Sequence, residues 1–162
     1  MTTFGQDAET VTTQDISSSE QVDQLIEETV SYQDVIETVI SSLDQDDTAM
    51  VSKTEAGYLW KFKYGTVEVF VQLTGSTDDD SFTVWSSVLK LPAKNELELM
   101  RKLLQMNGTE TLESRFAIIE DQVVVISTRT VAELSPGEIS RAITIVATIA
   151  DNNDEALREK FC

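Results

Sequence analysis

The stretch LELMRKLLQMNGTETLESRFAIIEDQVVVISTRTVAELSPGEISRAITIVATIADNNDEAL, residues 97–157, decides the fold, because it carries start and stop signals for three elements. Residues 97–108 have helical apolar spacing and end in Asn-Gly, which favours a left-handed helix end. Two short apolar runs flank Glu120-Asp121-Gln122 and predict a β-hairpin. Ser135-Pro136-Gly137-Glu138 combines a cap, a proline in the first turn and an acid three residues after the cap. The expected order is therefore helix, hairpin, long helix.

The details of this module predict how it packs. Asn95 with Glu98 is expected to cap the first helix, whose apolar residues are Leu97, Met100, Leu103 and Leu104. Both hairpin arms are apolar at nearly every position, which predicts strands in the sheet centre with both faces covered. The long helix has one apolar stripe: Ile139, Ala142, Ile143, Val146, Ile149 and Ala150, with Leu157 and Phe161 as extensions.

Alternating residues upstream of this module predict a β-meander. Its strands are expected at residues 58–64, 67–73 and 82–91, with a weaker strand at 49–54. Residues 17–43 follow helical spacing, with a capping box at Ser17 and a second helix start at Ser31. Residues 1–16 are interpreted as a disordered tail, and residues 17–162 as one domain. The order helix–meander–helix–hairpin–helix indicates an α+β fold, an antiparallel sheet with helices packed against it.

The charge of the chain limits its partners. Among 162 residues the net charge is −17, and residues 1–52 contain 12 Asp or Glu and no Lys or Arg. A polyanion gains nothing from releasing counterions around phosphates, so nucleic acid and anionic membranes are not expected as partners. A basic protein or peptide is favoured electrostatically, although acidity that only keeps the protein soluble is the alternative.

The N-terminal sequence and the cysteine content favour the cytoplasm. The first residues are polar and acidic, without the basic start and apolar core of a signal peptide. The single cysteine, Cys162, cannot form an internal disulfide, as expected in a reducing compartment.

Catalytic chemistry has little support in the sequence. The chain has no histidine to activate a nucleophile, and its glycines form no phosphate-binding motif. Asp44, Asp46, Thr48 and Glu55 match four offsets of a calcium loop, but Ala49 stands where the loop needs glycine, and a strand follows. The run Asp78-Asp79-Asp80 is interpreted as a solvated loop. No catalytic, metal-binding or cofactor-binding residue is assigned, and a non-enzymatic protein is expected.

Aromatic residues of the meander are the candidate binding residues. Five are proposed to contact a partner: Tyr58, Trp60, Phe62, Phe70 and Trp85. Exposed rings beside an acidic rim would suit a protein or peptide ligand. The alternative is that this strand face packs under the helices as core.

Three segments of the chain resemble the YbjN family. They are Leu103-Leu104-Gln105-Met106-Asn107, Arg115 to Val125, and Leu134-Ser135-Pro136-Gly137-Glu138-Ile139. The cluster Asp151-Asn152-Asn153-Asp154 followed by Leu157 is also similar to that family's last helix, and the order of elements matches over residues 32–161.

The resemblance implies a fold similar to type III secretion chaperones, which are small acidic α+β proteins, usually homodimers, that hold extended segments of a partner protein. A cytoplasmic, chaperone-like protein-binding module is therefore expected. One alternative is a regulatory or stress-response domain with one specific partner. Another is a metal-dependent domain that uses the Asp clusters. The resemblance transfers no catalytic residue, and a shared fold is weak evidence for a shared function.

Overall fold

Three helices and six strands make up the described part of the chain. The computed structural model describes residues 31–162, so the predicted tail at 1–16 and the helix start at Ser17 lie outside the described residues. The elements follow in the order α2 (Tyr32–Leu43), β1 (Met50–Thr54), β2 (Gly57–Tyr64), β3 (Val67–Leu73), β4 (Ser81–Lys90), α3 (Glu96–Thr109), β5 (Arg115–Ile119), β6 (Gln122–Thr130) and α4 (Pro136–Phe161).

The strands form one antiparallel sheet. Its order is β1-β2-β3-β4-β6-β5, and every neighbouring pair is antiparallel. The predicted meander and hairpin are confirmed, and β4 and β6 join them at the sheet centre. The second helix start predicted at Ser31 is also confirmed, since its hydroxyl accepts a hydrogen bond from the Asp34 amide at 3.1 Å.

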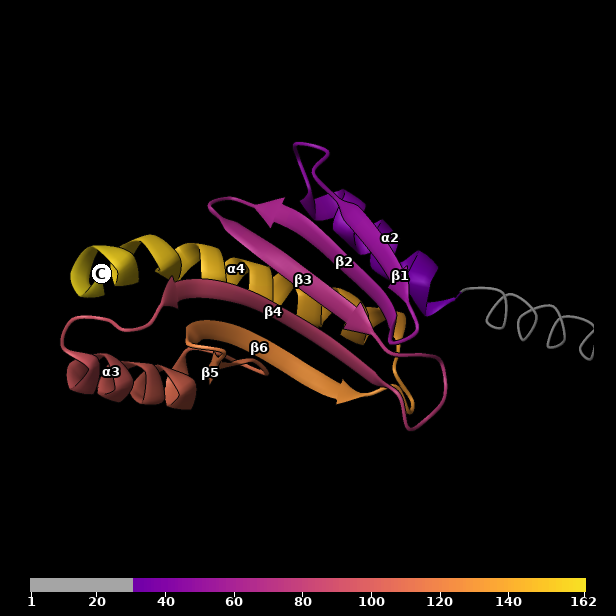
Figure 1. Ribbon diagram of the computed structural model, residues 1–162. Coiled ribbons are helices and arrows are strands. Elements are labelled where there is room, and N and C mark those ends of the chain that lie inside the picture. Colours follow the sequence, from indigo (N-terminus) through magenta and orange to yellow (C-terminus); the bar gives the residue numbers. More distant parts are fainter. Residues whose placement is uncertain (1–30) are drawn as a thin grey trace, which may run out of the picture. The chain divides into compact units, whose positions relative to one another are not determined.

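One face of the sheet forms the hydrophobic core. Every second residue of the central strands is buried on this face: Trp60, Phe62, Val69, Val71, Phe82, Val84 and Val125. Helix α4 contacts β2, β3, β4 and β6, and Figure 1 shows it running behind the sheet. The indole of Trp60 donates to the Glu37 carboxylate at 3.2 Å, which ties α2 to the same face.

Helix α4 begins as the sequence predicts. The Ser135 hydroxyl accepts from the Glu138 amide at 3.2 Å, and Pro136 occupies the first turn. The predicted stripe is buried from Ile139 through Phe161, except that Ala142 is only half-buried. In the described residues, no helix has the length and apolar character needed to cross a membrane.

A buried carboxylate attaches the β2–β3 turn to α4. The Asp154 side chain is fully buried, and it accepts from the Thr66 hydroxyl at 2.8 Å and lies 3.5 Å from the Arg158 guanidinium. The Thr66 amide donates to Asp151 at 2.9 Å. Gly65 has a φ of +58°, and an added Cβ would clash with the Asp151 carboxylate. The turn therefore requires both the backbone freedom and the small size of glycine.

Both predicted caps of α3 are wrong. Asn95 precedes the helix in a left-handed conformation, and its side chain makes no capping hydrogen bond. Asn107 and Gly108 lie inside the helix, which continues to Thr109. The Asn107 side chain instead accepts from the Phe116 amide at 2.7 Å and donates to the Phe116 carbonyl at 3.2 Å. A tertiary contact to β5 thus replaces the local cap that the Asn-Gly pair suggested.

The hairpin strands differ in their environment. The predicted turn is confirmed, with Glu120 and Asp121 at φ values of 50° and 59°. Full covering of both strands is wrong for β5, which is an edge strand with Ile118 53% and Ile119 43% exposed. The apolar pattern is the same in both arms, but only β6 has a strand on each side.

Candidate functional site: an open sheet face and a polar cavity

The sheet face opposite α4 carries a pair of stacked aromatic rings. Phe70 of β3 and Trp85 of β4 are directly opposite in the ladder, with ring centroids 5.3 Å apart and planes at 11°. Both side chains are half-buried, and Figure 1 shows no helix in front of β3 and β4. The half-buried Leu59 lies on the same face of β2, whereas Ile126, opposite Trp85 on β6, is buried. We call Leu59, Phe70 and Trp85 the open face. Half-buried aromatic rings on an uncovered sheet suit contact with another protein.

The five predicted partner-binding residues are divided between the two faces. Trp60 and Phe62 are 2% and 1% exposed on the covered face, so in this fold they serve the core. Tyr58, also on that face, is half-buried and stacks on Trp60 with centroids 5.5 Å apart. Phe70 and Trp85 lie on the open face. Partner binding stays a prediction, and of the five residues the half-buried Phe70 and Trp85 on the open face are the ones that support it.

Helix α3 has a second, outward apolar stripe. The helix buries Leu99, Leu103 and Met106, whereas Leu97 is 82% and Leu104 71% exposed. Met100 and Arg101 lie between these two leucines, and together they border a shallow hollow of about 460 Å³. A Cβ added at Gly108, the next position along the stripe, would meet nothing within 4 Å. We call Leu97, Met100, Arg101, Leu104 and Gly108 the outer stripe. Neighbouring exposed leucines of this kind are unusual on a helix face that no other part of residues 31–162 covers.

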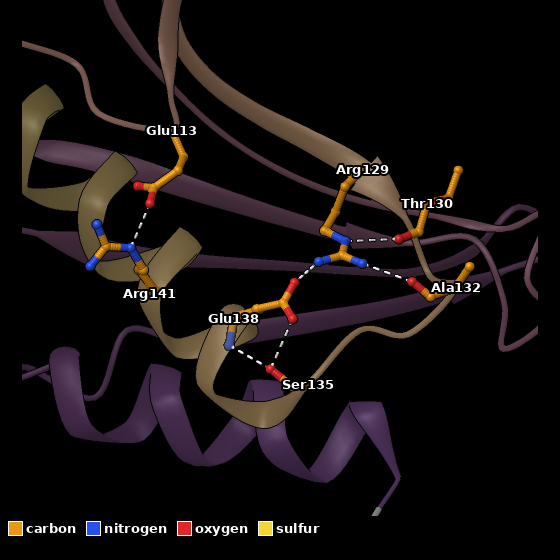
Figure 2. Close-up of polar contacts among 7 residues, drawn as sticks. All are labelled: Glu113, Arg129, Thr130, Ala132, Ser135, Glu138 and Arg141. Carbon is orange, nitrogen blue, oxygen red and sulfur yellow. Dashed lines mark hydrogen bonds and ion pairs between the residues drawn. The ribbon is translucent and has the colours of Figure 1, made fainter. Parts of the chain in front are cut away.

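A polar cavity of about 280 Å³ lies between α4, β6 and the segment before β5. Its walls include two Arg–Glu pairs, which Figure 2 shows. Arg141 donates through Nε to Glu113 at 2.8 Å, and Arg129 contacts the Glu138 carboxylate. The Arg141 hydrogen bond holds the pKa of Glu113 below its ordinary value, and the same contact raises the pKa of Arg141. Both members of this pair are therefore charged at neutral pH.

Each nitrogen of the Arg129 guanidinium contacts another group of the protein. Besides Glu138, the guanidinium donates to the Thr130 carbonyl at 3.0 Å and to the Ala132 carbonyl at 2.7 Å. These contacts hold the β6–α4 connection, where the Ser135 hydroxyl also donates to Glu138 at 3.1 Å. The sequence identified Ser135 and Glu138 as a cap. It carried no signal for the cavity, because Glu113 and Arg141 are far apart in the chain and meet only through the packing of α4.

In the two acidic loops, Asp44 and Asp80 accept hydrogen bonds from amides and hydroxyls of the same loop. Asp44 accepts from the Thr48 amide at 2.7 Å and from the Ala49 amide at 2.8 Å, and a strand follows where a calcium loop would need a helix. Asp80 accepts from the Thr77 amide and hydroxyl at 2.9 and 2.8 Å. Within residues 31–162, no cluster of three or more His, Cys, Asp or Glu is arranged to hold a metal ion.

Comparison with known families places the whole described sheet and its helices in one family. A family model matches residues 32–159, from α2 through nearly the end of α4. The chain belongs to the YbjN family. The description of that family reads "Putative bacterial sensory transduction regulator". No curated protein matches the YbjN chain described here.

A solved structure supports the fold of this YbjN protein. A chain in the crystal structure of the ExsC–ExsE complex superimposes with a TM-score of 0.55 at 14% identity. The match covers 76% of the YbjN chain and 90% of the other. The resemblance to the type III secretion chaperone fold is thereby confirmed at the level of architecture. At this identity the likeness concerns the fold alone.

Proposed function

We propose that this YbjN protein is a cytoplasmic, non-enzymatic, chaperone-like module that binds a segment of another protein. The observation that carries this proposal is the stacked pair Phe70–Trp85, half-buried on the part of the sheet where no helix of the described chain lies in front of β3 and β4 (Figure 1). Burial of apolar and aromatic surface is the main source of affinity in such contacts. The similar fold in the ExsC–ExsE complex, a protein–protein complex by its title, adds support.

The charge of the chain favours a basic partner at long range. The net charge of −17 creates a negative field that speeds the approach of basic proteins. This field is screened by salt, so association should slow as ionic strength rises. The apolar contact at the open face should persist at high salt.

The outer stripe of α3 supports a homodimer. In an antiparallel pair of α3 helices with a two-fold axis at the helix centre, Leu97 of one copy faces Gly108 of the other. Leu97 projects from the helix, and Gly108 leaves space for it on the other copy. The same surface therefore fits itself across a two-fold axis, as an isologous interface requires. Under the same axis, Leu104 faces the aliphatic part of Arg101, which can cover it.

A regulator with one specific partner is the second candidate function. The family's description as a sensory transduction regulator favours it. Both candidates use a protein-binding surface, but a chaperone holds many clients and a regulator holds one stoichiometric partner.

Affinity capture from the native cytoplasm tests the open face. The full-length protein serves as bait alongside the double variant Phe70→Ser/Trp85→Ser and the control Leu112→Ser, which alters an exposed leucine outside the sheet. We expect the wild type and the control to retain the same proteins and the double variant to lose them. Failure of the wild type to retain any protein, at low or high salt, would remove both binding functions.

Sedimentation equilibrium tests the dimer. The double variant Leu97→Glu/Leu104→Glu replaces both projecting leucines of the outer stripe with charged side chains, which removes the apolar surface of the proposed interface and should yield a monomer. Circular dichroism controls for folding, since both side chains are exposed and their replacement should leave the fold intact. A wild-type protein that remains monomeric at millimolar concentration would overturn the dimer.

A further inference from the structure

The polar cavity beside α4 contains charged groups with unused hydrogen-bonding capacity. Among the described residues, Arg141 uses only Nε, toward one oxygen of Glu113. The Arg141 and Glu113 side chains are 58% and 59% exposed, so the two Nη groups of Arg141 and the second oxygen of Glu113 face solvent and are accessible to a ligand. The Ser127 hydroxyl, which also lines the cavity, makes no side-chain hydrogen bond within residues 31–162.

The volume of the cavity and the net charge of its walls restrict which molecules it can bind. The volume of about 280 Å³ is just below the range of roughly 300–1,000 Å³ that is usual for ligand pockets, which favours a small molecule. The charges of the four ionised wall residues sum to zero, so the cavity offers a polyanion little electrostatic attraction. Ala142 and Ile145 of α4 add an apolar part to the lining.

We propose that this cavity binds a small aliphatic zwitterion of the α-amino acid class. The carboxylate of the ligand would accept from the Arg141 Nη groups, and its ammonium group would donate to Glu113. Charge-assisted hydrogen bonds of this kind are roughly twice as strong as neutral ones. The aliphatic side chain of the ligand would contact Ala142 and Ile145, and Ser127 would supply a further hydrogen bond. This proposal is independent of the open face, which lies on the other side of the sheet.

Calorimetric titration of the full-length protein tests the proposal with three probes of one shape. L-Leucine carries both charges, L-leucinamide lacks the carboxylate, and isocaproate lacks the ammonium group. We expect leucine to bind and each analogue to bind roughly tenfold to a hundredfold more weakly, because each loses one charge-assisted contact. No heat with leucine, and no shift of cavity amide signals in NMR spectra, would overturn the proposal. Equal affinity for all three probes would also overturn it, because neither charged group of leucine would then be recognised.

Two variants separate recognition from a structural effect. Arg141→Gln should weaken leucine binding by the same roughly tenfold to hundredfold factor but leave leucinamide binding unchanged, since leucinamide has no carboxylate to lose. Ala142→Leu keeps every charge and fills the cavity, so it should abolish binding of all three probes. The control Lys102→Gln removes an exposed positive charge of α3 that lies outside both the cavity and the outer stripe, and it should change nothing. If Arg141→Gln weakens leucine and leucinamide alike, or changes neither, the assigned role of Arg141 is wrong.

Discussion

The Thr66 hydroxyl donates a hydrogen bond to the fully buried Asp154 carboxylate at 2.8 Å, joining the β2–β3 turn to the last third of α4. These residues are 88 positions apart in the chain. A buried carboxylate is tolerated only when its hydrogen bonds are made, and Arg158 is its other polar neighbour. This contact helps to fix how the longest helix lies across the sheet.

Thr66→Val should therefore destabilise the protein. The substitution keeps the shape of the side chain but removes the donor, and a buried acceptor that loses its partner costs about 1–3 kcal/mol. Urea unfolding measures the change in the free energy of unfolding. The control Thr83→Val removes a hydroxyl that bonds Thr128 on the exposed side of the sheet, and it should cost less than about 0.5 kcal/mol. Equal losses in the two variants would contradict the role of the buried contact.

The two tryptophans should differ in solvent access. Trp60 is 2% exposed and bonded to Glu37, whereas Trp85 is half-buried on the open face. Acrylamide should quench the fluorescence of Trp60→Phe, which retains Trp85, more strongly than that of Trp85→Phe. Addition of a captured partner should protect Trp85 alone. Similar quenching of both variants would show that the open face is covered in solution.

Asp80 should contribute stability that is lost in acid. Hydrogen bonds from the Thr77 amide, the Thr77 hydroxyl and the Thr74 hydroxyl hold the pKa of Asp80 below its ordinary value of 3.8. A carboxyl whose pKa is lowered on folding stabilises the protein above its unfolded pKa, and this stability is lost as the pH falls through the folded value. The unfolding free energy should thus decline below about pH 3.8, and less steeply for Asp80→Asn. A slope that is unchanged in Asp80→Asn would contradict this account.

Gly108→Ala separates the stability of α3 from that of the proposed dimer. Alanine is favoured over glycine inside a helix by about 1 kcal/mol, and an added Cβ would meet nothing in the same chain. We expect the monomer to become more stable to urea. Because Leu97 of a second copy would occupy that space, the dimer should become weaker by sedimentation. If Gly108→Ala increases both the stability of the monomer and the affinity of the dimer, the proposed helix pairing is wrong.

The sequence was sufficient where an element carries its own boundaries. Ser135 with Glu138 sets the start of α4, and the alternation around Trp60 sets β2, because these signals act between residues close in the chain. The same local reasoning failed at Asn107, where a tertiary bond to Phe116 keeps the asparagine inside the helix.

The candidate sites depended on tertiary structure. Alternation showed that Tyr58, Trp60 and Phe62 share one face, but only the placement of α4 and α2 decided that this face is the covered one. The outer leucines of α3 and the cavity beside Arg141 likewise arise from which neighbours each helix meets.

By itself, then, the sequence determined the order of elements, the antiparallel α+β class and the likeness to the YbjN family. These follow from local periodicity, capping and turn chemistry. The tertiary structure alone decided which aromatic rings are exposed, which carboxylates are buried and which charges meet across a cavity. The physical reason is that burial and long-range pairing belong to the packed chain, and no short segment contains them.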